Sequence, residues 1–153
     1  MLFRSLDTTT RRIHIAGGGA VALSDTVGFI RDLPHTLVAS FRATLEETVH
    51  ADLLLHVVDS ASPVRERQIE DVNAVLREIG ADSIPQLEVW NKIDLREPSA
   101  AHEPGAERNE YGRISRVFVS ARTGAGLADL RTAIMEAART RAPAAPAAVA
   151  ISL

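Results

Sequence analysis

The sequence contains no cysteine among its 153 residues, and this absence excludes several kinds of site. Disulfide bonds, thiolate zinc sites and cysteine nucleophiles all need a thiol. The composition fits a reducing compartment, so we expect a cytoplasmic location. No apolar run approaches the roughly 18–20 residues that a membrane-spanning helix needs, so we expect no integral membrane segment. Met1 is followed by Leu, Phe and Arg rather than by the apolar stretch of a secretory signal.

Lysine is almost absent as well. Of the 17 basic residues, Lys92 is the single lysine and the others are arginine. Any mechanism that requires a second lysine is therefore excluded. The formal net charge of -3 does not indicate a nucleic-acid-binding surface. The length and the hydrophobic content of 46% fit one globular domain with a sizeable core.

Short apolar strands alternate with amphipathic helices along the chain. We expect strands at 12–16, 20–24, 53–58, 86–90 and 116–119, and helices at 37–49, 63–79 and from 127 onward. The first two strands flank three glycines and are expected to form a hairpin, and Ser62 is expected to cap the second helix with Pro63 at its first position. A polar loop of about twenty residues follows residue 94, and the uncharged residues 142–153 are expected to be a mobile tail. This alternation predicts an α/β domain with a mostly parallel sheet, in which ligands bind beyond the carboxyl ends of the strands.

A polar tetrapeptide, Asn91-Lys92-Ile93-Asp94, directly follows one predicted strand. A carboxylate such as Asp94 can accept two parallel hydrogen bonds from guanine N1–H and its exocyclic amine, whereas adenine has an acceptor at N1. The Asn91 amide would orient the loop and the base, and the aliphatic part of Lys92 would cover the ring. An ordinary polar loop is the alternative interpretation, because short motifs also occur by chance.

Two further polar segments also follow predicted strands. In Ser120-Ala121-Arg122, a small residue would let a backbone N–H approach the guanine carbonyl oxygen, although a helix-capping serine is the simpler interpretation of this segment alone. In Asp25-Thr26-Val27-Gly28, the aspartate could hold Mg²⁺ through water and the glycine would let an amide approach a terminal phosphate. A turn with an Asx-type hydrogen bond is the alternative there.

The order of these three segments resembles that of translation-factor-type GTPase domains, and the HflX family in particular. Longer stretches carry this resemblance: residues 3–12 (FRSLDTTTRR), 24–35 (SDTVGFIRDLPH), 41–47 (FRATLEE) and 51–59 (ADLLLHVVD). The resemblance covers about residues 2–140. It implies a P-loop-NTPase-like three-layer α/β sandwich, with residues 1–141 forming a partial G domain and 142–153 an Ala/Pro-rich tail.

The resemblance also implies a set of ligands and contacts. GTP or GDP and Mg²⁺ would be bound, and Ser5 in the first switch would join Asp25 as a Mg²⁺ ligand. No catalytic residue is assigned, because Phe29 stands where many GTPases carry a water-orienting glutamine. The residues expected to contact the nucleotide are Phe3, Arg4, Ser5, Leu6, Asp7, Asp25, Thr26, Val27, Gly28, Asn91, Lys92, Ile93, Asp94, Ser120, Ala121 and Arg122.

One part of this GTPase pattern is absent from the sequence. No Gly-x-x-x-x-Gly-Lys-[Ser/Thr] phosphate loop occurs, and Lys92 already belongs to the guanine motif. The resemblance therefore implies a domain without its first strand, phosphate loop and first helix, from a shortened gene product or a start site placed too late. The first strand of the family would lie between strands 20–24 and 53–58. Its loss would leave backbone groups on both neighbours without partners and a marginally stable chain that tends to associate.

Two functions remain open at this point. The first is a ribosome-associated HflX-type GTPase that binds the large ribosomal subunit. The second is a catalytically inactive remnant, or a scaffold that contacts guanine or the ribosome without hydrolysing GTP. Arg4, Arg11 and Arg12 form a basic cluster that is either a solvated loop or an rRNA contact. The five histidines show no metal-ligand spacing, and His56 is expected to be a core residue with a satisfied hydrogen bond.

Overall fold

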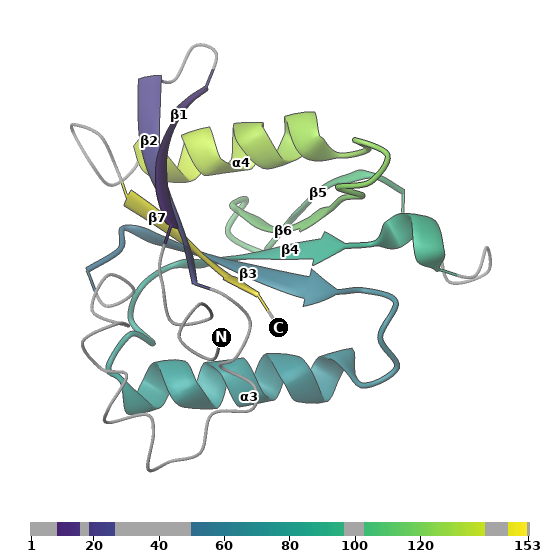
Figure 1. Ribbon diagram of the computed structural model, residues 1–153, viewed down its shortest axis with the longest axis horizontal. Coiled ribbons are helices and arrows are strands. Elements are labelled where there is room, and N and C mark those ends of the chain that lie inside the picture. Colours follow the sequence, from purple (N-terminus) through teal and green to yellow (C-terminus); the bar gives the residue numbers. More distant parts are fainter. Residues whose placement is uncertain (1–8, 16–18, 27–49, 97–102, 140–146, 153) are drawn as a thin grey trace.

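A single seven-stranded sheet organises the computed structural model, which describes residues 9–15, 19–26, 50–96, 103–139 and 147–152 (Figure 1). The strands are β1 (Thr9–Ile15), β2 (Gly19–Thr26), β3 (Leu53–Asp59), β4 (Gln86–Asn91), β5 (Gly105–Arg108), β6 (Ile114–Phe118) and β7 (Ala147–Ser152). The helices are α3 (Arg65–Glu78), α4 (Leu127–Arg139) and the short 3-10 helix η3 (Ile93–Leu95).

The strands are ordered β1-β2-β7-β3-β4-β6-β5 across the sheet. From β2 to β6 all neighbours run parallel, whereas β1 and β5 pair antiparallel at the two edges. The predicted α/β class with a mostly parallel sheet is confirmed. The predicted hairpin is confirmed too, since β1 and β2 pair from Thr9–Asp25 to Ile15–Gly19.

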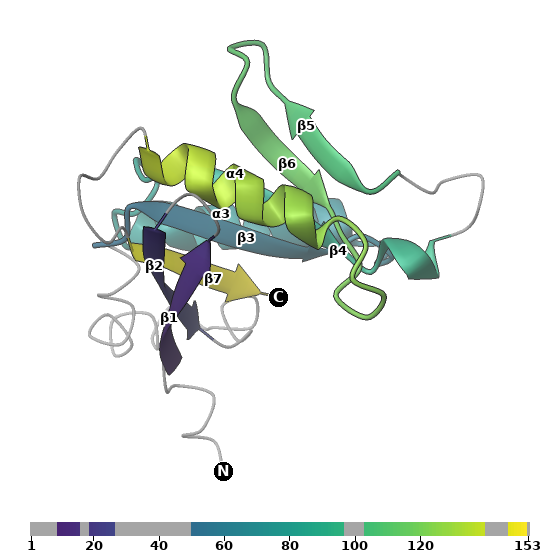
Figure 2. The ribbon, with the colours of Figure 1, turned by 90° about the horizontal axis from the view of Figure 1, so that it is seen from above.

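Each face of the sheet is covered by one of the two described helices, which gives three layers (Figures 1 and 2). Residues alternate between the faces along a strand, so β4 divides its side chains between two cores. Leu87 and Val89 pack in the cluster that includes Ala133 and Ile134 of α4. Trp90 packs instead with Val58 and Phe118 on the α3 side. Neither described helix is long and apolar enough to cross a bilayer.

The expectation of a mobile tail is wrong for Ala147–Ser152, which form β7 between β2 and β3. The expectation that the strands on either side would lack backbone partners is wrong for the same reason. Residues 22–26 of β2 and 53–57 of β3 both pair with β7. β-Branched residues such as Val149 and Ile151 favour strands. The edges of β2 and β3 supply hydrogen-bond partners on both sides of this segment.

Two smaller expectations also need correction. The polar stretch after residue 94 contains β5, which pairs with β6 across a turn where the Asn109 side chain accepts hydrogen bonds from the amides of Tyr111 and Arg113. Helix α3 begins at Arg65 rather than at Pro63. Ser62 Oγ accepts from the Val64 amide at 3.3 Å, so Ser62 stabilises the turn before the helix instead of capping it.

His56 lies at the centre of β3 and is fully buried, as expected for a core residue. Among the described residues, neither ring nitrogen has a hydrogen-bond partner, so the expected satisfied hydrogen bond is not found there. Burial lowers the pKa of His56, and the negative charge of Glu88 partly offsets this shift. The imidazole is therefore held in its neutral form.

Because the pKa of His56 is lower in the folded than in the unfolded state, its contribution to stability should be complete above pH 6.5 and decline as the pH falls below that value. We expect His56→Leu to weaken this acid-side loss. It should also raise the unfolding free energy at pH 7 by about 1–2 kcal/mol, because an unpaired buried polar group is replaced by an apolar one of similar size. Chemical denaturation between pH 5 and pH 8 measures both effects, with the exposed His14→Gln as control. An unchanged acid-side slope in His56→Leu would contradict the assignment.

Candidate functional site: a strand-end loop cluster

The candidate site lies at the edge of the sheet where the parallel strands β3, β4 and β6 end. Asp59 is the last residue of β3 and pairs in register with Asn91, the last residue of β4. Ser120 follows β6 by two residues. Backbone hydrogen bonds join these strand ends, from the Ser60 amide to the Asn91 carbonyl at 3.0 Å and from the Val119 amide to the Trp90 carbonyl at 2.9 Å.

The loop after β4 makes a sharp turn at Lys92, whose φ of 65° places it in the left-handed region. Non-glycine residues with this conformation are uncommon and concentrate at functional sites. Ile93 then buries its side chain, and its amide donates to the Val119 carbonyl at 3.3 Å. This anchor holds the loop against the segment that follows β6, while Asp94 remains exposed.

Two side-chain hydrogen bonds connect the predicted guanine motif to the predicted Ser-Ala-Arg segment. The Ala121 amide donates to Asn91 Oδ1 at 3.0 Å. The Ser120 hydroxyl donates to Asp94 Oδ1 at 2.8 Å. Asp94 and Ser120 are 26 residues apart in the sequence, so these bonds join two distant motifs into one loop cluster. The bonds also fix the orientation of the Asn91 and Asp94 side chains.

Ser120 is 1% exposed and also organises its own loop. Its Oγ accepts from the Thr123 amide at 3.2 Å, and its backbone exchanges hydrogen bonds with Gly124 and Ala125. The loop then passes close under the end of β6 at Gly126. A Cβ at Gly126 would overlap the Phe118 carbonyl oxygen, so only glycine fits between the loop and the strand.

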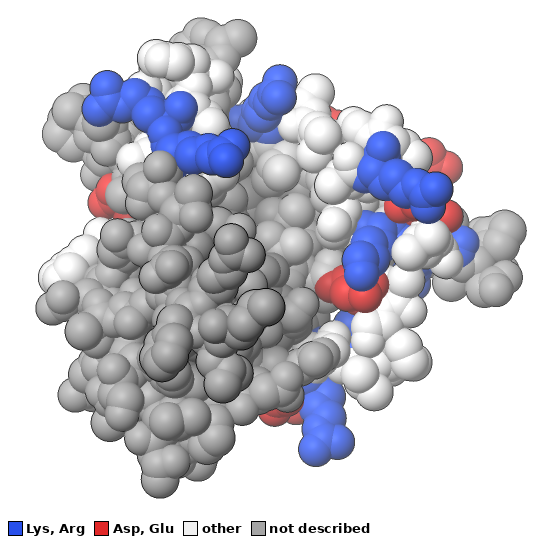
Figure 3. Space-filling view, in the orientation of Figure 1, with Lys and Arg blue, Asp and Glu red and all other residues white. Residues whose placement is uncertain are grey.

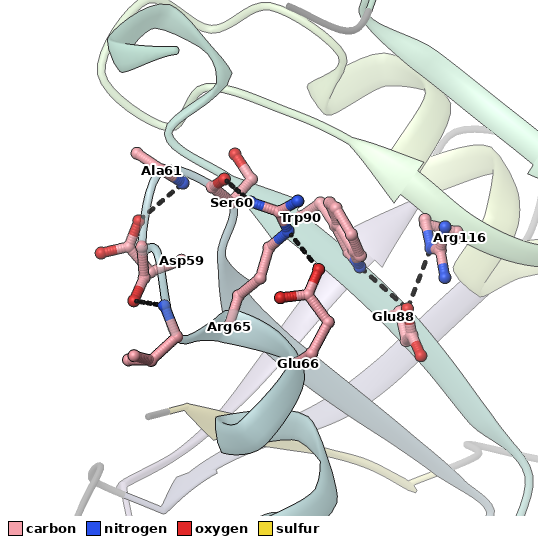
Figure 4. Close-up of polar contacts among 10 residues, drawn as sticks. Asp59, Ser60, Ala61, Arg65, Glu66, Glu88, Trp90 and Arg116 are labelled. Carbon is pink, nitrogen blue, oxygen red and sulfur yellow. Dashed lines mark hydrogen bonds and ion pairs between the residues drawn. The ribbon is translucent and has the colours of Figure 1, made fainter. Parts of the chain in front are cut away.

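The end of β3 adds a carboxylate to the cluster. The Lys92 ammonium lies 3.0 Å from Asp59 Oδ2, while Asp59 Oδ1 accepts from the Ala61 amide at 3.0 Å. The ion pair is about half exposed on the lysine side, so it contributes little to stability by itself. It links the end of β3 to the turn after β4, while the hydrogen bond from Ala61 to Asp59 shapes the start of the loop after β3 (Figure 4).

Beneath this edge, Trp90 is held between two arginine side chains (Figure 4). The guanidinium of Arg116 lies 4.3 Å from the ring centroid and that of Arg65 lies 5.4 Å from it. Glu88 accepts from both Trp90 Nε1 at 2.8 Å and Arg116 Nε at 2.9 Å. This network fixes the residue immediately before Asn91 and so stabilises the start of the predicted guanine motif.

The structure describes only some of the residues that are predicted to bind the phosphates and Mg²⁺. Asp25 and Thr26 end β2, which runs parallel to β7 and β3 and therefore ends at the same edge as the loop cluster. Phe3, Arg4, Ser5, Leu6, Asp7, Val27 and Gly28 lie outside the described residues.

A Mg²⁺ site is expected at Asp25 and Ser5, and Ser5 lies outside the described residues. A carboxylate and a hydroxyl are hard oxygen ligands of the kind that Mg²⁺ prefers, and this ion commonly takes only one or two carboxylates together with water and phosphate. Accordingly, the lack of a group of three or more acidic or histidine side chains among the described residues does not count against Mg²⁺.

Three residues of the cluster were missed by sequence analysis: Asp59, Thr123 and Gly126. Asp59 carried a signal, because it ends an apolar strand in the same way as Asp25 does. The glycine pair at 124 and 126, just after Ser120, was the signal for a tightly turning loop. Thr123 acts through its backbone amide, which donates to Ser120, and through its hydroxyl, which accepts from the Ala125 amide at 3.3 Å. Threonine is common in such local turns, so its identity was a weak signal.

Comparison with known proteins decides the family. Residues 1–92 match the family described as 50S ribosome-binding GTPase. The chain belongs to this family. Among curated proteins, it is 53% identical to the GTPase HflX of Escherichia coli over 135 residues, and 48% identical to that of Magnetococcus marinus over 137 residues. The GTPase HflX of Akkermansia muciniphila is 45% identical over 143 residues. The resemblance to HflX is thereby confirmed.

The chain spans only about a third of these relatives. The alignment covers 88% of this chain but 31% of the Escherichia coli protein, and the corresponding shares for the Akkermansia muciniphila protein are 92% and 32%. The 143-residue alignment covers 92% of this chain, so it includes Asn91–Asp94 and the Ser120 segment. The family model, by contrast, matches residues 1–92 only.

The Gly126 contact gives a direct test of how the loop cluster is built. Gly124 and Gly126 both have positive φ, of 86° and 78°, but a Cβ at Gly124 would meet nothing within 4 Å. We expect Gly124→Ala to cost about 1 kcal/mol from backbone conformation alone. Gly126→Ala should cost roughly 2 kcal/mol more because the loop must move away from Phe118. Urea unfolding of the two variants measures the difference, and equal values would contradict the close approach.

Proposed function

We propose that this chain binds guanine nucleotides through the loop cluster, as part of an HflX-type GTPase domain. The observation that carries the proposal is the pair of hydrogen bonds from Ala121 to Asn91 and from Ser120 to Asp94. They hold an exposed carboxylate and a carboxamide side by side at the carboxyl edge of a parallel sheet, which is where such sheets bind ligands. A purine with two adjacent N–H donors fits this arrangement.

The chemistry of Asp94 favours guanine over adenine. Each carboxylate oxygen has two lone pairs, so Asp94 can accept from Ser120 and still accept from guanine N1–H and the exocyclic amine. Adenine would present an acceptor to the carboxylate and leave it without a donor from the base, so the carboxylate would lose the two hydrogen bonds that guanine supplies. The aliphatic part of Lys92 would cover the base, with its ammonium held at Asp59.

The phosphate side needs groups beyond the described residues. Asp25 and Ser5 would hold Mg²⁺, and Thr26, Val27 and Gly28 would approach the terminal phosphate. The sequence supplies no glycine-rich lysine loop, and amide cradles of that kind contribute most of the electrostatic stabilisation in phosphoryl transfer. GTP hydrolysis therefore belongs to a G domain in which another segment supplies that loop.

A ribosomal partner and a cytoplasmic location complete the proposal. The family is described as 50S ribosome-binding GTPase, and this description supports a contact with the large ribosomal subunit. Arg11 and Arg12 are exposed on β1, and basic side chains stand over the β1–β2 hairpin in Figure 3. Such an edge suits the phosphates of rRNA. The HflX relatives favour a working G domain, completed by a segment that supplies the phosphate loop, over the alternative of an inactive remnant or scaffold.

Asp94→Asn tests the guanine assignment. The asparagine keeps an oxygen for the Ser120 hydroxyl but replaces one acceptor by a donor, so it should repel guanine and accept xanthine, which has a carbonyl in place of the amine. We expect GDP affinity to fall by about 10–100-fold and xanthosine diphosphate affinity to rise, as measured by calorimetry. The control is Asp82→Asn, at an exposed turn outside the cluster. Equal loss of both nucleotides, or none, would contradict the assignment.

A comparison of nucleotides tests the phosphate side. Because the amide cradle contributes most to triphosphate binding, we expect this chain to bind guanosine, GDP and GTP with affinities within about tenfold of each other. We expect its GTP turnover to stay at background. The measurements are calorimetric titrations and phosphate release, beside an amino-terminally extended form that includes a phosphate loop. Turnover by the 153-residue chain equal to that of the extended form would contradict this division of labour.

A further inference from the structure

A cavity of about 240 Å³ lies at the end of the sheet opposite to the candidate site. Its lining includes the first residues of three strands, Leu53 of β3, Gln86 of β4 and Ile114 of β6. The candidate site stands at the carboxyl ends of the same strands. Because β3 has seven residues, the two places are roughly 20 Å apart. We term this space the α4 cavity, since α4 forms one of its walls.

Small side chains on α4 account for the space. Ala133 and Ala137 are four residues apart and therefore lie on one face of the helix. Leu53 and Leu87 line the cavity from the sheet, and all four residues belong to or pack against one hydrophobic cluster. A methyl side chain is too short to fill the gap between helix and sheet. The inner part of the α4 cavity is therefore lined by apolar side chains of the core.

The rim of the α4 cavity is polar and is supplied by the β5–β6 hairpin, which lies beside α4 (Figure 2). Arg113 is exposed, and its guanidinium has no hydrogen-bond or ion-pair partner among the described residues. Asn109 Oδ1 accepts from two backbone amides, which leaves the NH₂ group of that side chain to donate elsewhere. The rim therefore offers hydrogen-bond donors and an unpaired positive charge.

Glu136 is the acidic residue in the described lining, and it does not cancel this charge. Both of its carboxylate oxygens accept from the guanidinium of Arg108, at 2.8 Å and 3.2 Å. These hydrogen bonds lower the pKa of Glu136, so the carboxylate is ionised and paired at neutral pH. Arg113 is left as the charge that a bound anion can neutralise.

We propose that the α4 cavity binds a carboxylate that carries an apolar group about the size of a phenyl ring. The apolar group enters between α4 and the strand ends, and the carboxylate stays at the rim, where Arg113 can donate to both of its oxygens. The volume lies below the range of about 300–1,000 Å³ that is usual for drug-sized ligands, which limits the size of the apolar group. Binding here is independent of the proposed guanine-nucleotide function, because none of the described residues that line the cavity belongs to the loop cluster.

The probe is 3-phenylpropionate, which joins a phenyl ring to a carboxylate through a short chain. Its neutral analogue, 3-phenylpropanamide, has the same shape but no charge. Titration of each into the ¹⁵N-labelled 153-residue chain, without nucleotide, measures the affinities from amide chemical shifts. We expect shifts at residues 113–115 and 133–137, a Kd of about 1 mM or tighter for the acid, and at least about fivefold weaker binding of the amide.

A peptide distinguishes the two sources of such a ligand. Acetyl-Gly-Gly-Phe presents the same carboxylate and ring at the end of a polypeptide chain. Tighter binding of the peptide than of 3-phenylpropionate would identify a protein carboxyl terminus as the source. Weaker binding would identify a free acid, and either result supports the proposed chemistry of the cavity.

Two variants separate the charge from the space. Arg113→Gln should weaken binding of 3-phenylpropionate at least about fivefold and leave the amide unchanged, whereas Arg77→Gln on the exposed surface of α3 should change neither. Ala137→Leu should fill the cavity and abolish the shifts from both compounds. Its control, Ala128→Leu, stands at an exposed position of the same helix and should leave both affinities unchanged.

Equal affinities for the acid and the amide in the unaltered chain would overturn the proposal. Binding that persists in a folded Ala137→Leu variant would also overturn it, as would the absence of shifts at a probe concentration about tenfold above the expected Kd. If Ala137→Leu does not fold, Arg113→Gln still decides the question, because its side chain is exposed and undiminished binding of the acid would contradict the role of Arg113.

Discussion

Parallel pairing of β3, β4 and β6 is the constraint on which the candidate site depends. Parallel strands present all of their carboxyl ends at one edge, so segments that are distant in sequence arrive together there. The register from Asp59–Asn91 to Trp90–Phe118 sets the height at which each loop leaves the sheet. Once those heights are fixed, Asn91 reaches the Ala121 amide and Asp94 reaches the Ser120 hydroxyl without further adjustment of the strands.

How much of this could be predicted depended on whether the signal was local. The buried run from Leu53 to Val58 and the motif at Asn91–Asp94 are local patterns, and both were placed correctly on the chain. The strand at 147–152 was missed because its sequence is typical of a tail and only the open position between β2 and β3 makes it a strand. Tertiary context of this kind overrides composition.

The same distinction applies within the candidate site. The polar identities of Asp94 and Ser120 indicated what they could bind, but their mutual hydrogen bond is a consequence of the fold. The role of Gly126 follows from a close approach to the Phe118 carbonyl, a contact across the loop that no spacing rule contains. Likewise, the unpartnered ring of His56 could be recognised only after its neighbours were known, because an isolated histidine in an apolar strand usually has a partner.

Under the proposed function, recognition of the base and binding of the phosphates depend on different parts of the sheet. The loop after β4 is stabilised by neutral and charge-assisted hydrogen bonds among residues of β4, η3 and the Ser120 segment, none of which involves β7. The phosphate side depends instead on β2, whose place in the sheet is set by β7. A shift of β7 would therefore move Asp25 relative to the loop after β4 without breaking the hydrogen bonds within that loop. Under the proposed function, base selection and triphosphate affinity would then respond to different parts of the sheet.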